Sequence, residues 1–243
     1  MANENSLAHL PERDRDHECE GVGPSKVCVR VIAVAELPSR FGRFQVVGFW
    51  NNRDGKDHIA IVHGDVVGRH AVMTRLHSEC LTGDALGSLR CDCRDQLEHA
   101  LRRIAEEEHG LVLYLRQEGR GIGLLNKIRA YALQDGGLDT VEANQALGFR
   151  DDERDYAVAA HMIHSLDVRS VRLLTNNPAK IDGLTQYGVT VAGRVPHVIP
   201  ANPYNRFYLE TKASRSGHWI DLDGKPHLPE QNEPVVVGSP PER

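Results

Sequence analysis

The chain contains 243 residues and has a formal net charge of -5, with 40% hydrophobic and 26% charged residues. These values are typical of a globular protein with one large domain or two small ones. They argue against a general nucleic-acid binder, which would be basic, and no apolar run approaches the length of a membrane span. We therefore expect neither nucleic acid nor a membrane as a partner.

The start of the chain and its cysteines indicate where the protein works. The first residues are too polar for a signal peptide. The five cysteines are odd in number, and a single residue separates Cys91 from Cys93, which argues against a secreted disulfide framework. We expect a cytoplasmic protein. Cys19 and Cys28 receive no role, since neither has a nearby partner in the sequence.

The composition divides the chain into one domain and two tails. Residues 1–25 alternate acids, bases and turn formers without an apolar period, which predicts a disordered N-terminal tail. Residues 223–243 are polar and rich in proline, which predicts a flexible C-terminal tail. Residues 26–222 carry regular apolar patterns and are expected to form one domain.

Within that domain, strand and helix patterns alternate. Apolar and β-branched runs predict strands at 27–35, 44–50, 57–62, 71–77, 111–115, 171–174 and 189–195. Helical spacing predicts helices at 92–108, 124–134 and 154–166, Asp139 and Glu142 form a capping-box pattern, and Pro178 opens a further helix. The first four strands follow one another through tight turns, which favours antiparallel pairing. We expect an α+β fold, a mixed or antiparallel sheet with flanking helices.

Three cysteines, Cys80, Cys91 and Cys93, lie close together around a turn rich in glycine and aspartate. Thiolates bind zinc tightly, and three protein ligands leave a fourth tetrahedral position for water. The spacing differs from the usual C-x-x-C of zinc sites. This stretch alone therefore supports zinc ligation and ordinary buried thiols about equally.

Residues 116–123, Arg-Gln-Glu-Gly-Arg-Gly-Ile-Gly, follow a predicted strand and precede a predicted helix. Glycine lets backbone N–H groups approach phosphate oxygens, a helix N-terminus favours anions, and arginine adds bidentate contacts. A tight strand-to-helix turn explains the glycines equally well. The Glu118 carboxylate would repel phosphate, but it suits the adjacent N1–H and amino donors of guanine.

Three further features also have ordinary structural explanations. Residues 151–156 are mostly acidic and fit the first turn of a solvated helix. Thr175 and Lys180 lie on either side of Pro178 and suit either a phosphate or a helix cap. Tyr131 fits core packing on the helix at 124–134.

Together and in this order, these stretches resemble GTP cyclohydrolase II, the enzyme family that opens riboflavin biosynthesis. The resemblance extends over residues 27–220 and rests on the segments 75–84, 90–93, 96–97, 116–131, 139–144, 152–156 and 173–178 with Lys180. Several long motifs in one order are more specific than any one of them.

The resemblance implies one zinc ion per subunit on Cys80, Cys91 and Cys93, magnesium with the triphosphate, and a homodimer. It implies contacts to GTP from Arg75, Leu76, His77, Ser78, Glu79, Gln96, Glu118, Gly119, Arg120, Thr140, Thr175 and Lys180. It also implies that Asp152 accepts a proton, that Arg154 is the nucleophile that takes the nucleotide from pyrophosphate, and that Tyr131 lies near the base. The implied reaction releases formate from C8 of guanine and pyrophosphate, leaving a diaminopyrimidinone ribosyl phosphate.

Most of the implied reaction agrees with the known chemistry of the groups involved. Zinc lowers the pKa of bound water from about 15.7 to about 7, which makes hydroxide available for attack on C8. Magnesium and basic side chains offset the charge of a departing pyrophosphate. Arg154 suits its implied role less well, because arginine stays protonated, with a pKa above about 12. Residues two apart do not face each other on a helix, so Asp152 could accept the proton of Arg154 only on an irregular backbone. The alternative is that Arg154 stabilises the α-phosphate electrostatically while water attacks.

Two other functions stay open from the sequence. One is a homologue in a secondary pathway that stops at the formylamino pyrimidine, and Tyr131 favours complete deformylation over it. The other is a zinc-containing and GTP-binding module without turnover, against which Asp152, Arg154 and Tyr131 argue. A dihydroxybutanone phosphate synthase often precedes this domain in the family; here only a short polar stretch precedes it, so we expect that activity to be absent.

Overall fold

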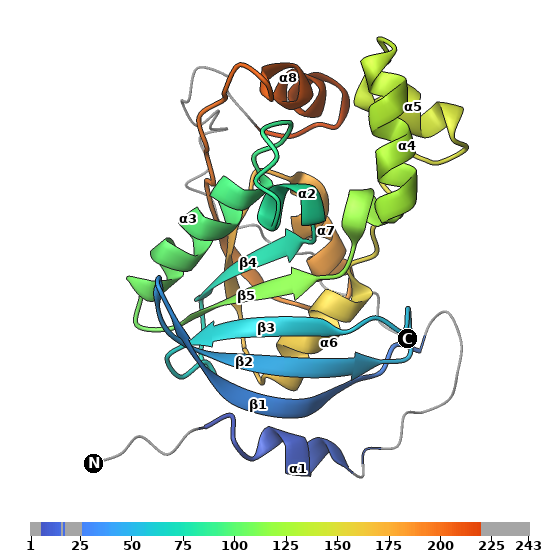
Figure 1. Ribbon diagram of the computed structural model, residues 1–243. Helices are drawn as coiled ribbons and strands as arrows, with labels where there is room; N and C mark the ends of the chain where they lie inside the picture. The colour runs from blue at the N-terminus through green and yellow to red at the C-terminus, as the bar shows by residue number, and fades with distance from the viewer. Residues whose placement is uncertain (1–5, 16, 18–25, 220–243) are drawn as a thin grey trace, which may run out of the picture.

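A mixed seven-stranded sheet forms the centre of the computed structural model, which describes residues 6–15, 17 and 26–219 (Figure 1). Its strands are β1 Val29–Ser39, β2 Gly42–Asn51, β3 His58–His63, β4 Val72–Ser78, β5 Gly110–Leu115, β6 Val171–Leu174 and β7 Val191–Val195. Their order across the sheet is β1-β2-β3-β5-β4-β6-β7. The predicted α+β class with a mixed sheet is confirmed, and each strand overlaps the apolar run that predicted it.

The sheet has an antiparallel half and a parallel half. β1, β2, β3 and β5 pair antiparallel, whereas β5, β4, β6 and β7 pair parallel. The expectation that the first four strands pair in sequence is wrong for β4, because β5 lies between β3 and β4. A helix connects β4 to β5 and returns the chain in the same direction, as parallel pairing requires. The nearly continuous apolar sequence of β5 suits this central, doubly covered place.

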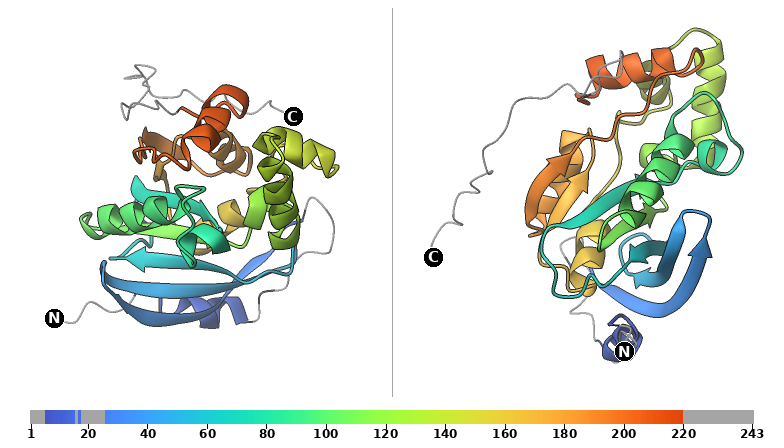
Figure 2. Two further views of the ribbon diagram at one scale, coloured as in Figure 1. Left: turned by 45° about the horizontal axis from the view of Figure 1, so that its top comes forward. Right: turned by 90° about the vertical axis from the view of Figure 1, so that its left-hand side faces the viewer.

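Helices lie on both faces of the sheet and above the ends of its parallel strands (Figures 1 and 2). They are α2 Leu81–Asp84, α3 Cys93–Ala105, α4 Leu124–Asp135, α5 Thr140–Ala146, α6 Ala157–Ser165, α7 Pro178–Gln186 and α8 Arg206–Arg215, with a 3-10 turn at Glu118–Gly121. The predicted capping box at Asp139 and Glu142 is confirmed at the start of α5, and Pro178 opens α7 as predicted. α8 was not predicted.

Two apolar clusters hold these layers together. The larger packs β1, β2 and β3 against α6, with Met162 and Ile163 fully buried. The smaller packs Phe44 and Val112 against Ile104 of α3. Because successive strand residues point to opposite faces, the two clusters lie on opposite sides of the sheet.

The N-terminal segment differs from its prediction as a tail. Residues 10–15 form helix α1, Leu10–Arg15, which lies along β1 (Figure 1). Leu7 and Leu10, one turn apart, are buried in the larger apolar cluster, and the Asp14 carboxylate accepts a hydrogen bond from the N–H of Val31 at 2.7 Å. Two leucines among many charges were too weak a pattern to predict a helix. The rest of the predicted N-terminal tail, residues 1–5, 16 and 18–25, lies outside the described residues.

Leu10→Ala is expected to destabilise the protein by about 2–5 kcal/mol, the usual cost of truncating a fully buried leucine. Urea unfolding would measure it, with Leu86→Ala as the control because Leu86 is 72% exposed. If Leu10→Ala cost no more than the control, α1 would not be part of the folded core.

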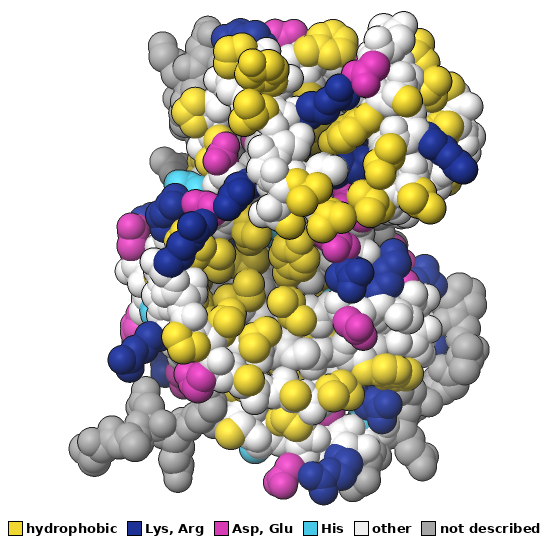
Figure 3. Space-filling view, in the orientation of Figure 1, with side chains coloured by type: hydrophobic (Ala, Val, Ile, Leu, Met, Phe, Trp, Pro, Cys, Tyr) yellow, Lys and Arg dark blue, Asp and Glu magenta, His cyan; other side chains and the backbone are white. Residues whose placement is uncertain are grey.

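Other predictions concern the ends of the chain and its surface. The predicted C-terminal tail at 223–243 and Cys19 lie outside the described residues, whereas Cys28 is disulfide-bonded, contrary to the expectation that it has no partner. No helix in the described ranges is long and apolar enough to cross a membrane. Figure 3 shows hydrophobic side chains gathered over the upper part of one face, where α2, α4 and α8 lie.

Candidate active site

The carboxyl ends of the parallel strands meet at one edge of the sheet, beside a cavity of about 400 Å³. β4 leads into Cys80, β5 leads into Glu118, and β6 leads into Thr175. α8 contributes Tyr208 and Lys212 to the cavity lining. Crevices outside the carboxyl ends of parallel strands are the usual ligand sites of such sheets.

The cavity brings together most of the predicted site residues. They are Arg75, His77, Ser78, Glu79, Cys80, Cys91, Cys93, Gln96, Glu118, Gly119, Arg120, Tyr131, Thr140, Arg154 and Lys180. Leu76, Thr175 and Asp152 do not line it. Leu76 is a core residue whose carbonyl accepts a hydrogen bond from Lys180 Nζ at 2.8 Å, and the Thr175 hydroxyl accepts one from the N–H of Asn177 at 3.0 Å.

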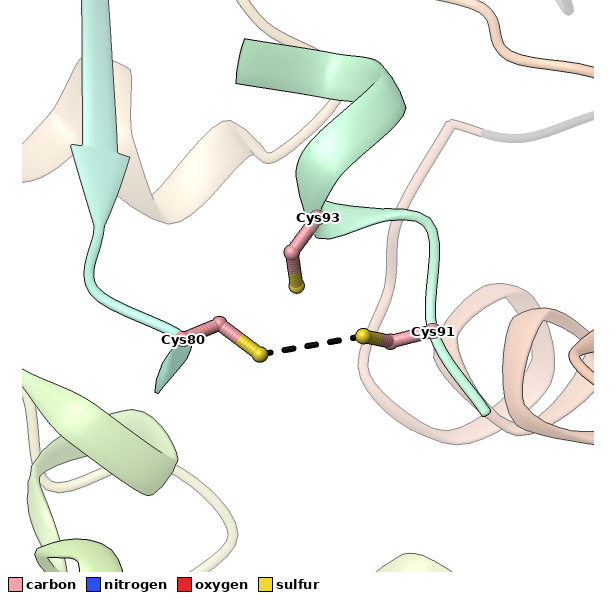
Figure 4. Close-up of side chains that lie close together, drawn as sticks. All are labelled: Cys80, Cys91 and Cys93. Atoms are coloured by element: carbon pink, nitrogen blue, oxygen red, sulfur yellow. Dashed lines mark hydrogen bonds between the residues drawn. The ribbon is translucent and has the colours of Figure 1, made fainter. Parts of the chain in front are cut away.

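The three cysteines converge from separate pieces of backbone (Figure 4). Cys80 follows β4, Cys91 lies in the loop after α2, and Cys93 opens α3. Their sulfurs lie within 4.8 Å of one another, with Cys80 Sγ 3.7 Å from Cys91 Sγ. Hydrogen bonds from the Cys91 and Cys93 thiols and the nearby ammonium of Lys127 hold the pKa of Cys80 far below its usual value.

The space between the sulfurs fits a metal ion. A Cβ added to Gly83 would lie 2.8 Å from Cys91 Sγ and 3.1 Å from Cys80 Sγ, so only glycine leaves this space free. Three soft thiolates in a tight triangle match the ligand preference of zinc. Among the described residues, these cysteines form the one cluster of three potential metal ligands of this kind.

Gly83→Ala is therefore expected to weaken zinc binding by about tenfold or more, the scale of changes around a metal's ligands. Competition with a chromogenic chelator would measure the affinity. Gly48→Ala is the matched control, since a Cβ there meets nothing within 4 Å. Equal zinc affinity in both variants would show that the sulfur triangle does not hold the metal.

A buried ion pair lies beside the sulfurs. Lys127 Nζ is 2.7 Å from Glu118 Oε1 and 3.0 Å from Cys80 Sγ. The Glu118 carboxylate also accepts hydrogen bonds from the N–H groups of Gly119 and Leu81, at 3.0 and 2.7 Å. Three of its roughly four acceptor positions are thus filled. One acceptor position of Glu118 is left for a bound nucleobase, whereas the paired N1–H and amino donors of guanine would use two.

Cationic side chains also crowd the cavity. Burial lowers the pKa of Arg75 to about 10, and burial together with Arg75 and Arg154 lowers the pKa of Lys180 far below its usual value. Arg75 Nε and Arg120 Nη2 are buried and have no hydrogen-bond partner among the described residues. Buried cations that repel one another and keep unfilled donors suit a polyanion such as a triphosphate.

Asp152 and Arg154 form an ion pair on irregular backbone. The predicted helix at 154–166 begins only at Ala157. The Asp155 carboxylate accepts a hydrogen bond from the Ala157 N–H at 2.8 Å, which favours a turn before the helix. The N–H and Nε of Arg154 can therefore both donate to Asp152 Oδ1, at 3.0 and 2.8 Å.

The two partners of this pair are held in their charged forms. Burial would raise the pKa of Asp152, but hydrogen bonds from Arg154 lower it overall. Burial would likewise lower the pKa of Arg154, yet the nearby Tyr156 and Asp152 raise it. The arrangement opposes proton transfer from Arg154 to Asp152.

Tyr131 faces the cavity close to the cysteines. Its hydroxyl oxygen lies 3.5 Å from Thr82 Oγ1, and the Arg90 guanidinium lies 5.0 Å from the ring centroid. Burial raises the pKa of Tyr131 to about 12, so its hydroxyl keeps its proton. Core packing, the ordinary explanation of this residue, does not describe its surroundings.

Sequence reasoning missed two lysines at this site. Lys127 lies four residues before Tyr131 on α4, and this spacing, which puts both on one helix face, could have revealed it. Lys212 on α8 had no such signal. Its Nζ lies 3.3 Å from Oδ1 of Asp92, the residue between Cys91 and Cys93 in the sequence. Ser216, just beyond α8, donates a hydrogen bond to Asp151 Oδ2 at 2.8 Å. These contacts tie α8 and the residue after it to the start of α3 and to the segment before α6.

His197 contacts Gln96 of the cavity lining, and its burial makes the stability of the folded protein depend on pH. Its buried ring bonds the Gln96 carbonyl at 3.1 Å, and burial, with repulsion from Arg75 and His99, lowers the pKa of His197 far below 6.5. The unfolded chain therefore binds a proton near pH 6.5 that the folded chain does not, so stability is lost as the pH falls.

From about pH 6.5 downwards, His197 alone should lower the free energy of unfolding by up to about 1.4 kcal/mol per pH unit. His197→Gln should show a correspondingly shallower dependence on pH. Urea unfolding between pH 7 and pH 5 would measure both slopes, and identical slopes would contradict the assignment.

Comparison with known proteins identifies the family to which the chain is related. A sequence model of the GTP cyclohydrolase II family matches residues 29–196. The chain is 58% identical over 192 residues to GTP cyclohydrolase-2 of Tolumonas auensis, covering 79% of this chain and 98% of that one. It is 58% identical to GTP cyclohydrolase-2 of Proteus mirabilis, covering 79% and 96%, and 57% identical to that of Klebsiella pneumoniae, covering 78% and 95%. On these grounds the chain belongs to the GTP cyclohydrolase II family.

Proposed function

We propose that this enzyme hydrolyses GTP, opening the imidazole ring of guanine with release of formate and pyrophosphate, as the first step of riboflavin biosynthesis. One observation carries the proposal: a triangle of thiols fit for zinc and a group of buried, incompletely paired cations line the same cavity. A metal that activates water and a site for a polyanion are the two requirements of this reaction on GTP.

The three cysteines and the residues beside them are proposed to carry out ring opening. Cys80, Cys91 and Cys93 would hold one zinc ion, which supplies Lewis-acid activation of water when bound. Tyr131, protonated and beside this triangle, would donate a hydrogen bond to the base. Glu118 has one acceptor position left for a guanine donor.

The cationic side chains of the cavity are proposed to bind the triphosphate with magnesium. Arg75 and Arg120 carry unfilled N–H donors, and Lys180 adds a further charge. Arg154 is proposed to stabilise charge at the α-phosphate electrostatically, with Asp152 fixing the position of its guanidinium. The raised pKa of Arg154 supports this role over nucleophilic attack, which needs the neutral group.

Incubation with GTP and magnesium tests the proposal, with the products identified by mass spectrometry. We expect one formate and one pyrophosphate for each GTP consumed, together with the deformylated pyrimidine. Accumulation of the formylamino pyrimidine would instead indicate the secondary-pathway activity. Unchanged GTP bound to a zinc-loaded protein would indicate a binding module without turnover.

We further propose that the enzyme is a cytoplasmic homodimer. The exposed apolar side chains of α4 and α8 support an interface there, among them Leu125, Ile128 and Phe207. Analytical ultracentrifugation would test it: a monomer at micromolar concentration would contradict the proposed dimer.

A further inference from the structure

The proposed metal site has a carboxylate close by that is not among its ligands. Glu118 and Cys80 both bond to the same ammonium group, that of Lys127, at 2.7 and 3.0 Å. Glu118 nevertheless lies outside the cluster of potential ligand atoms, which contains only the three cysteines in the described part of the chain. A buried carboxylate one side chain away from a metal site calls for an explanation, because carboxylates are common zinc ligands.

Lys127 provides that explanation. Its side chain is 10% exposed and that of Glu118 8% exposed, so the ion pair is shielded from water. The ammonium lies between the sulfur and the carboxylate and compensates the charge of both. The N–H groups of Leu81 and Gly119 hold the same carboxylate from other directions. A buried carboxylate that lost the ammonium would lack a counter-ion, and a divalent cation nearby would be its strongest replacement.

We propose that Lys127 is a positioning residue that holds Glu118 away from the metal and thereby keeps one coordination position open. The proposal rests on the proposed function, because it takes the three cysteines as the zinc ligands. Zinc sites with four protein ligands are structural, whereas catalytic sites keep a position free. In this protein, one lysine makes the difference between the two kinds of site.

Cobalt(II) in place of zinc makes the open position visible, because its d–d absorption reports coordination. Imidazole added to the cobalt-loaded wild-type protein is expected to occupy the open position and change the spectrum. In Lys127→Met, Glu118 should fill that position, and the apparent imidazole affinity should fall by about tenfold or more, the scale of changes in groups that contact a metal's ligands. The double variant Lys127→Met with Glu118→Gln should regain the response, since an amide is a poor zinc ligand.

Controls separate this role from a general loss of structure. Lys56→Met removes an exposed lysine and should leave the spectrum and its imidazole response unchanged. Lys127→Gln removes the charge but keeps a donor, and it provides the test if the methionine variant does not fold. Lys127→Arg keeps the cation and should retain the response.

The sign of the change in zinc affinity is a second readout. Losing a cation and gaining a carboxylate ligand should tighten zinc binding in Lys127→Met, while formate release falls. An undiminished imidazole response in folded Lys127→Met or Lys127→Gln protein, or a lost response that Glu118→Gln does not restore, would overturn the inference but leave the proposed function intact. A wild-type protein that takes up neither cobalt nor zinc would overturn both.

Discussion

Cys91→Ser is expected to lose bound zinc and to lower the rate of formate release by at least about 1,000-fold. The size follows from the water nucleophile, whose pKa is about 15.7 when free and about 7 on zinc. A serine hydroxyl is a hard, weakly acidic ligand and does not replace a thiolate. Zinc per subunit by atomic absorption and formate by an enzymatic assay would measure the two losses.

The same variant separates metal binding from nucleotide binding. Arg75 and Lys180 do not depend on the metal, so Cys91→Ser should still bind a non-hydrolysable GTP analogue. Leu89→Ala is the control, because Leu89 lies in the same loop and is 57% exposed. Full formate release by a zinc-free Cys91→Ser protein would remove the metal from the mechanism.

Arg154→Ala should lower the rate of pyrophosphate release by about 100- to 1,000-fold, the usual cost of removing one group that stabilises a transition-state charge. Zinc content should not change, because Arg154 contacts Asp152 and not the cysteines. Arg154→Lys should recover little, since an ammonium lacks the fork that binds a carboxylate and a phosphate together. Stopped-time assays of pyrophosphate would measure both variants.

The two roles of Arg154 predict different protein masses. If Arg154 acts electrostatically, protein quenched during turnover has the mass of the free chain. A covalent guanidinium–nucleotide adduct would add the mass of the nucleotide, and its detection by intact-mass spectrometry would contradict our proposal. An unchanged rate in Arg154→Ala would exclude both roles.

Much of the fold was predictable because its signals are local. The strands and α3 follow from apolar periodicity, and Asp139 with Glu142 and Pro178 mark helix starts by their own chemistry. The place of β5 between β3 and β4 was not predictable in this way. Strand order depends on the path of the chain between strands and leaves no mark on the strand sequences.

The candidate site, too, was predictable from the sequence only in part. The family resemblance implied the cysteines and most of the cavity-lining cations as site residues. From the sequence we could say that Asp152 and Arg154 would pair only on an irregular backbone. The hydrogen bond between Asp155 and the start of α6, which favours a turn there, became visible only in the structure. Lys127 and Lys212 were missed because a single lysine in a helix is an ordinary surface residue until the fold buries it.

Zinc K-edge X-ray absorption of the metal-loaded protein tests the central claim most directly. We expect three sulfur neighbours at about 2.3 Å and one nitrogen or oxygen neighbour at about 2.0–2.1 Å. A shell of four sulfurs, or one with fewer than three, would contradict a zinc ion held by Cys80, Cys91 and Cys93 with one position open.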